Sequence, residues 1–121
     1  MSVVVGNGRF KQAILSALAD KEMVRIIDCA TLCQKSVSGI ISETGISHST
    51  AYRKIKWMLE EGLLFTEKIA ITPDGKKFSL VRSTIKSIAI NYDSGNTTVQ
   101  IEYNINVLEK TTTRLFSIRP D

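Results

Sequence analysis

Several residue types are scarce in this chain, and their scarcity excludes whole classes of site. Its 121 residues include one histidine and two cysteines. A structural zinc site needs four ligands, and His48 has no neighbours at ligand spacing. No apolar run approaches the ~20 residues of a membrane-spanning helix, and the N-terminus shows no signal peptide. We therefore expect a cytoplasmic protein with no metal centre and no membrane partner.

Catalytic and cofactor-binding patterns are missing as well. The sequence offers no Ser/His/Asp set and no pair of acids near His48. Gly6 and Gly8 lack the strand–turn–helix context that a phosphate-binding glycine loop requires. We therefore expect a protein that is not an enzyme and binds no cofactor, and the sequence identifies no small-molecule effector.

Cys29 and Cys33 stand four residues apart, which would place them on one face of a helix. Two thiolates are too few for a structural zinc, and a disulfide between them would strain a regular helix. We interpret them as buried structural cysteines. The alternative, a redox or soft-metal sensor, has less support from this pattern.

Positive charge is concentrated in one part of the chain. The formal net charge is +4 and the sequence pI is about 9.2. Residues 48–86 contain eight lysines and arginines against four acids, so this region accounts for the whole surplus. A basic region on a neutral body suits a polyanionic partner, although a merely soluble basic surface is the alternative.

The stretch from Gly45 to Leu64 predicts an amphipathic helix. Ser47 stands at the N-cap position, where its hydroxyl can accept from backbone N–H groups, and Gly62 stands just past the end. One face is apolar and consists of Ala51, Ile55, Met58 and Leu59. The other face carries groups that can reach base edges and phosphates in a major groove, namely His48, Ser49, Tyr52, Arg53 and Lys56. An ordinary surface helix with a solvated basic face is the alternative.

A shorter helix is expected directly upstream, over Ser36–Thr44, with Ser36 as its cap. Only Gly45-Ile46-Ser47 separates it from the next helix, and two helices joined by such a turn form the helix-turn-helix unit. Two further helices are expected before it, over Arg9–Ala19 and from a capping Asp20 onward. The inward face of the second consists of Met23, Ile26, Ile27, Ala30 and Cys33.

After Leu63 the apolar period changes to two, which predicts two β-hairpins. The first spans about residues 63–82, turns at Pro73-Asp74-Gly75, and carries Lys76 and Lys77 near its tip. The second spans about residues 85–105 and could enlarge the sheet or pair with another chain at an edge. In the C-terminal segment, 106–121, the apolar spacing favours a short helix, whereas the threonine run favours a strand.

The run from Val37 to Leu64 resembles winged-helix transcriptional regulators of the ArsR-like kind, including many small archaeal ones. The residues that match the family pattern are Ile46, Ser47, Ser49, Thr50, Arg53, Ile55, Gly62 and Leu63. The likeness extends over about Ala13 to Arg82. It implies an α+β winged helix-turn-helix in a single domain, 1–121, with three to four helices at about 9–62 and a wing at about 63–82. The second hairpin, at about 85–105, is an addition to the plainest members.

The resemblance also implies sequence-specific binding of double-stranded DNA in transcription regulation, by a homodimer. Under this hypothesis Ser47 and Thr50 cap the helix and touch the DNA backbone, whereas Ser49, Tyr52 and Arg53 read bases with help from His48 and Lys56. Lys76 and Lys77 hold flanking phosphates from the wing. The Cys-x-Cys metal pair of metal-sensing relatives aligns with Ser36 and Ser38, so that site is absent.

The dimer contact and the class of partner each have an alternative. Apolar residues at both ends of the chain could form the dimer contact or only complete the core of the monomer; they are Phe10, Ile14, Leu18, Leu108, Leu115 and Phe116. The chain could instead be a winged-helix protein-interaction module that reads no DNA. Such a module would dock its partner through Trp57, Leu59 and the second hairpin.

Overall fold

The structure is a computed structural model that describes residues 2–104. Its elements are, in order, β1 (Ser2–Val4), α1 (Arg9–Leu18), α2 (Lys21–Thr31), β2 (Lys35–Ser36), α3 (Val37–Thr44), α4 (His48–Glu60), β3 (Leu64–Ile71), β4 (Lys77–Ser83), β5 (Ile85–Asp93) and β6 (Asn96–Tyr103). The expected α+β fold is therefore confirmed. The segment 106–121, with its expected helix and with Leu108, Leu115 and Phe116, lies outside the described residues.

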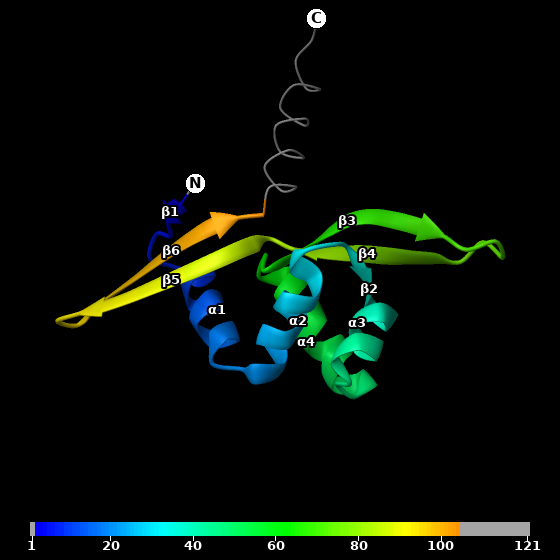
Figure 1. Ribbon diagram of the computed structural model, residues 1–121, viewed down its shortest axis with the longest axis horizontal. Helices are drawn as coiled ribbons and strands as arrows, with labels where there is room; N and C mark the ends of the chain where they lie inside the picture. The colour runs from blue at the N-terminus through cyan, green and yellow to red at the C-terminus, as the bar shows by residue number, and fades with distance from the viewer. Residues whose placement is uncertain (1, 105–121) are drawn as a thin grey trace, which may run out of the picture.

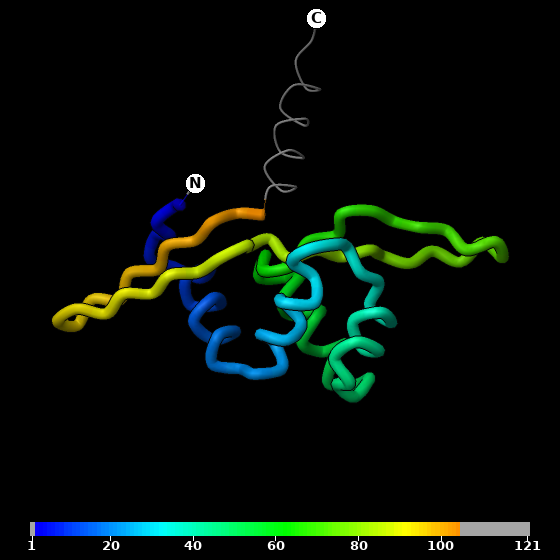
Figure 2. Tube along the Cα trace, viewed as in Figure 1, coloured from blue at the N-terminus to red at the C-terminus, as the bar shows by residue number. Residues whose placement is uncertain are grey.

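The helices form one layer, and two long hairpins form another (Figure 1). The β3–β4 hairpin is the wing, and we call the β5–β6 hairpin the second hairpin. The two hairpins extend in opposite directions from a shared centre, with the helices beneath it (Figure 2). The succession of α2, α3, α4 and the wing is the winged helix-turn-helix that the sequence predicts.

Helices α2 and α3 begin where the sequence places a capping side chain. The Asp20 carboxylate accepts hydrogen bonds from the N–H groups of Glu22 and Met23, at 2.9 and 3.1 Å. The Ser36 hydroxyl accepts from the N–H of Gly39 at 3.0 Å. Gly45 then ends α3 with a φ of 73°, a left-handed conformation that costs glycine little because it has no Cβ.

One apolar core joins the helices to both hairpins. Helix α4 contributes Ala51, Ile55 and Met58, as its apolar face predicts. The remaining buried apolar residues are Ala13, Ile14, Ala17, Ile26, Ala30, Ile40, Ile41, Ile46, Leu63, Leu64, Val81, Ile85, Val99 and Ile101. Because Ile14 is fully buried and Phe10 packs against this core, the monomer itself uses most of the apolar face of α1. Leu18 alone of its three candidate dimer residues is exposed.

Each hairpin carries a third, short strand that the sequence does not reveal. Strand β2 pairs with β4, and β1 pairs with β6, so the strand orders are β2-β4-β3 and β1-β6-β5. The second hairpin thus belongs to a sheet of its own and does not enlarge that of the wing. It closes through Ser94 and Gly95, whose φ values of 46° and 85° suit a tight two-residue hairpin turn.

The end of α2 corrects the interpretation of Cys33. Helix α2 ends at Thr31, so Cys33 lies beyond the helix and is exposed instead of facing inward. Distant side chains satisfy the carbonyl groups at this end, because Asn104 Nδ2 donates to Thr31 O at 2.9 Å and Arg82 to Leu32 O at 2.8 Å. Such bonds replace those that a longer helix would have formed.

Met58 supplies a direct test of the core. Its side chain is fully buried on α4, so Met58→Ala should lower the free energy of unfolding by roughly 2–5 kcal/mol through lost burial and a cavity. Leu32→Ala is the matched control, because Leu32 is 86% exposed and its truncation should cost less than about 0.5 kcal/mol. Urea denaturation of both variants measures the two changes, and equal losses would contradict this core.

Candidate nucleic-acid interface

The face of α4 that points away from the core is polar and basic. His48, Ser49, Tyr52, Arg53 and Lys56 are all exposed, as the sequence predicts. The rings of His48 and Tyr52 stack with centroids 6.4 Å apart and an interplanar angle of 24°, so they form one aromatic platform on the first turns. Among the described residues, no carboxylate forms an ion pair with Arg53 or Lys56. Both cations are therefore free to meet a polyanion.

Lys54 behaves differently from its basic neighbours on α4. It is 8% exposed, and its ammonium group donates to Asp20 Oδ2 at 2.6 Å and to Glu22 Oε1 at 2.8 Å. The sequence interpretation counted Lys54 in the basic surface and missed this cluster. A signal was present, because Lys54 lies three residues after Ala51 and four before Met58, on the apolar stripe itself.

Lys54, Asp20 and Glu22 form what we call the Lys54 cluster. Its contacts shift the pKa values of Asp20 and Lys54. The hydrogen bond from Lys54 holds the pKa of the Asp20 carboxyl below its ordinary value, although partial burial works in the opposite direction. The hydrogen bonds to Asp20 and then to Glu22 raise the pKa of Lys54. Lys54 is therefore a charged structural tie between the start of α2 and the middle of α4.

The turn before α4 is held by buried groups. Thr44 donates from its hydroxyl to Ile40 O at 2.7 Å, and Arg25 of α2 donates to the Thr44 carbonyl. Ile46 is 4% exposed and anchors the turn in the core. Helix α2 thus holds the helix-turn-helix at two points, through Arg25 at the turn and through the Lys54 cluster on α4.

The start of α4 departs from the prediction for Ser47. Ser47 occupies the N-cap position, as predicted, but its side chain makes no capping hydrogen bond, so the expected bond to the first turn is absent. The adjacent Ile46 is buried. The Ser47 hydroxyl is exposed, and Thr50 is half-buried on the first turn.

Lys76 and Lys77 lie at the wing tip, as predicted, and both are exposed. Thr72 orders the loop that carries them, because its hydroxyl accepts from Lys76 N at 3.0 Å and its N–H donates to Lys76 O at 2.8 Å. The wing tip lies at the far end of the hairpin from the helices (Figure 1). The candidate residues therefore form two groups, one on α4 and one at the wing tip.

The predicted basic surface is smaller than the sequence suggests. Lys54 is neutralised in its cluster, and Arg82 lies 3.7 Å from Glu67 and bonds to the Leu32 carbonyl. One of the four acids of this region is also neutralised, because Glu61 accepts a hydrogen bond from Arg9 at 2.8 Å. The exposed bases of residues 48–86 are Arg53, Lys56, Lys68, Lys76, Lys77 and Lys86.

The cysteines are not the buried pair that the sequence suggests, because Cys29 is half-buried and Cys33 is exposed. The Cys29 thiol donates to Glu43 Oε2 at 3.1 Å, and Lys35 Nζ lies 2.6 Å from the same oxygen. Burial, reinforced by the Glu43 carboxylate, raises the pKa of the Cys29 thiol to about 11. Within residues 2–104, no three His, Cys, Asp or Glu side chains are grouped to hold a metal ion. No helix in that range is long and apolar enough to span a membrane.

The Lys54 cluster predicts a specific loss of stability in acid. Because the pKa of Asp20 is lowered on folding, its contribution is present above the ordinary Asp pKa of about 3.9 and is lost as the pH falls through the lower folded value. Asp20→Asn keeps a capping side chain but removes the charge, so it should cost roughly 1.5–3 kcal/mol at pH 7. The cost should shrink as the pH falls below the ordinary Asp pKa of about 3.9, in denaturation curves of the two proteins. A difference that does not change with pH would refute the cluster's role.

The cysteines should differ sharply in reactivity. At pH 8 a thiol with the pKa of Cys29 is roughly a thousandth thiolate, the reactive form, so iodoacetamide should label the exposed Cys33 at least about tenfold faster. Peptide mass spectrometry over a time course measures both rates. Glu43→Gln should accelerate the labelling of Cys29, because the carboxylate helps to keep that thiol protonated. Equal rates in the parent protein would contradict this assignment.

No protein-family model and no curated protein matches this chain. Among solved structures, the chain is similar to the crystal structure of NolR from Sinorhizobium fredii, at 15% sequence identity and a TM-score of 0.42. The match covers 90% of this chain and 83% of that one. A likeness this weak carries no argument about function, so the candidate interface rests on the geometry of the chain itself.

Proposed function

We propose that this protein binds double-stranded DNA sequence-specifically and regulates transcription, with α4 in the major groove. The proposal rests on the different surroundings of the lysine and arginine side chains of α4. Lys54 is turned inward and neutralised, whereas Arg53 and Lys56 are exposed without an acidic partner among the described residues. Two exposed cations without acidic partners on one helix face suit a polyanionic partner.

The exposed face of α4 offers the chemistry that base recognition requires. Arg53 can donate two parallel hydrogen bonds to guanine, and Ser49 and Tyr52 can donate to or accept from base edges. His48 and Lys56 flank these groups on the same face. Ser47 and Thr50, at the start of the helix, suit contacts to the DNA backbone, and a helix N-terminus itself favours phosphate.

The wing supplies a second, sequence-independent contact in this proposal. Lys76 and Lys77 extend from an ordered loop, and lysines so placed bind flanking phosphates as point charges. A homodimer would present two copies of α4 to two half-sites about one helical turn, ~34–36 Å, apart. The proposed partners are therefore a DNA duplex and a second copy of the chain.

The alternative, a protein-interaction module, depends on two side chains that are partly buried in the core. Trp57 and Leu59, on which that alternative depends, are both half-buried and pack against the apolar cluster. The second hairpin keeps its exposed residues. A partner docked there would leave α4 free to bind DNA.

Two substitutions separate base reading from phosphate binding. A duplex selected from a random-sequence pool and a scrambled duplex serve as ligands, and fluorescence anisotropy at several salt concentrations gives the affinities. Arg53→Ala should lose roughly 1–3 kcal/mol on the selected duplex and discriminate less between the two. Lys77→Ala should weaken both duplexes alike and flatten the dependence on salt, because one released counterion is lost.

Lys11→Ala on α1 is the matched control, since Lys11 lies outside both groups and donates to Asn7. Its affinity for both duplexes should equal that of the parent. Unchanged affinity in the Arg53 and Lys77 variants, or failure to enrich any sequence from the pool, would refute the proposal.

A further inference from the structure

Strand β5 has an open edge. Strand β6 pairs with one side of β5, and no described strand pairs with the other. From Ser87 to Asp93 every residue except the half-buried Ile88 is exposed, so no side chain of the described part covers this edge. Natural sheets usually protect such an edge with lysine, proline or a bulge. In β5 a bulge between Ile85 and Ser87, together with Lys86, protects only the start of the strand. The rest of the strand contains no lysine or proline.

The same strand leaves an apolar row partly uncovered. Ile88, Ile90 and Tyr92 share one face, and they pair across the hairpin with Ile101, Val99 and Thr97. Val99 and Ile101 are buried, so this is the face that packs on the core. The hairpin extends beyond the helices (Figure 1), and Ile90 and Tyr92 are 45% and 71% exposed as a result.

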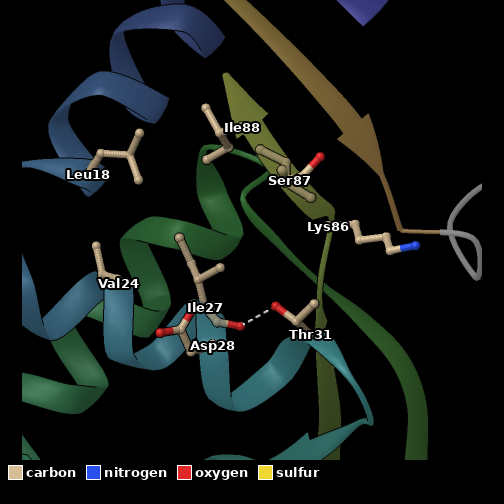
Figure 3. Close-up of a pocket in the computed structure, with 9 residues that line it drawn as sticks. Leu18, Val24, Ile27, Asp28, Thr31, Lys86, Ser87 and Ile88 are labelled. Carbon is tan, nitrogen blue, oxygen red and sulfur yellow. Dashed lines mark hydrogen bonds between the residues drawn. The ribbon is translucent and has the colours of Figure 1, made fainter. Parts of the chain in front are cut away.

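A pocket adjoins the row at its inner end. It has a volume of about 310 Å³ and lies between α1, α2 and β5. The side chains of Leu18, Val24, Ile27 and Ile88 point toward its interior, and Asp28 lies at its rim (Figure 3). None of its lining residues comes from β6, so β5 is the strand of this sheet that borders the pocket.

We propose that two copies of the chain pair through the open edges of β5, antiparallel and across a two-fold axis, with the partner's Tyr92 in this pocket. A two-fold pair of antiparallel strands requires one residue to face its own copy. Centring the pair on Ile90 brings Ile88 opposite the partner's Tyr92 and Ser87 opposite the partner's Asp93. The apolar row then continues across the seam, and the Ser87 hydroxyl keeps its own hydrogen bond to Glu102 Oε1, at 3.0 Å.

The two neighbouring registers pair less of the strand. The bulge between Ile85 and Ser87 breaks the alternation of faces, so the regular stretch of β5 is Ser87–Asp93. Centring on Ile90 pairs this whole stretch with its copy, from Ser87 opposite Asp93 inward. Centring on Ala89 runs into the bulge beyond Ser87, and centring on Asn91 runs into the hairpin turn beyond Asp93. The regular stretch of β5 therefore pairs with itself most completely about Ile90.

The pocket supplies the anchor that edge pairing alone would lack. Neighbouring strands lie about 4.8 Å apart, so a side chain opposite Ile88 on the same face enters the space that Ile88 lines. Tyrosine is a preferred anchor for such pockets, because its ring is large and rigid and its hydroxyl can bond at the rim. The Asp28 carboxylate provides an acceptor there. Two-fold symmetry supplies the contact twice.

This inference rests on the homodimer of the proposed function but not on base reading by α4, so the two can fail separately. Ile90→Lys and Ile90→Asp should each be monomeric, near 13.4 kDa, in sedimentation at concentrations where the parent is a dimer. An equimolar mixture of the two should regain the dimer, because opposite charges then face each other at the axis. Ile69→Lys, which charges an exposed apolar position on the wing, is the control and should stay dimeric.

The pocket is tested by Tyr92. Tyr92→Ala should weaken the dimer on the order of 30-fold or more, and Tyr92→Phe should weaken it much less. Circular dichroism of each variant checks that the fold is kept. A Tyr92→Ala protein that dimerises as well as the parent would overturn the pocket assignment.

Cross-linking tests the register. In a chain with Cys29→Ser and Cys33→Ser, Ile90→Cys should form a disulfide-linked dimer on addition of diamide, whereas Ile88→Cys alone, which keeps Tyr92, should not. A mixture of Ile88→Cys and Tyr92→Cys proteins should cross-link. A monomeric parent protein, or a dimer that survives Ile90→Lys, would refute the inference. If the Ile90→Lys monomer still prefers the selected duplex, base reading by α4 stands independently of this surface.

Discussion

The position of α4 depends on a cation inside the helical layer. Lys54 reaches the carboxylates of Asp20 and Glu22 at 2.6 and 2.8 Å, and Asp20 also caps α2. Lys54 itself is buried, so removing its acids would leave an uncompensated charge among apolar side chains. The start of α2 and the exposed face of α4 are therefore mechanically linked. A small rotation of α4 would separate Lys54 from both acids, so the cluster fixes which side chains face outward.

The sequence predicted most of the fold because its signals are local. Capping by Asp20 and Ser36, the glycine at 45 and the change of period after Leu63 each depend on a few neighbouring residues. The exposed face of α4, from His48 to Lys56, follows from the same helical spacing. Local chemistry and tertiary packing agree at these positions, and such agreement is what makes them readable from one sequence.

The predictions that failed concern contacts between distant parts of the chain. Lys54 was counted in the basic region, and its acidic partners Asp20 and Glu22, at the start of α2, lie 34 and 32 residues away in the sequence. Burial of a lysine depends on such partners. Cys33 was assigned to a helix that Asn104 and Arg82 help to end from 73 and 50 residues away. Strands β1 and β2 contain too few residues for a period, and their partners alone define them.

The pairing of β1 with β6 sets an order on folding during synthesis. Ser2 pairs with Glu102, so β1 leaves the ribosome well before β6 and must wait for nearly the last described residues before it finds its partner. The helix-turn-helix and the wing, in contrast, close over short loops and can form earlier. The half of the molecule that carries α4 can therefore be in place while the second sheet is still incomplete, with β1 as its final strand.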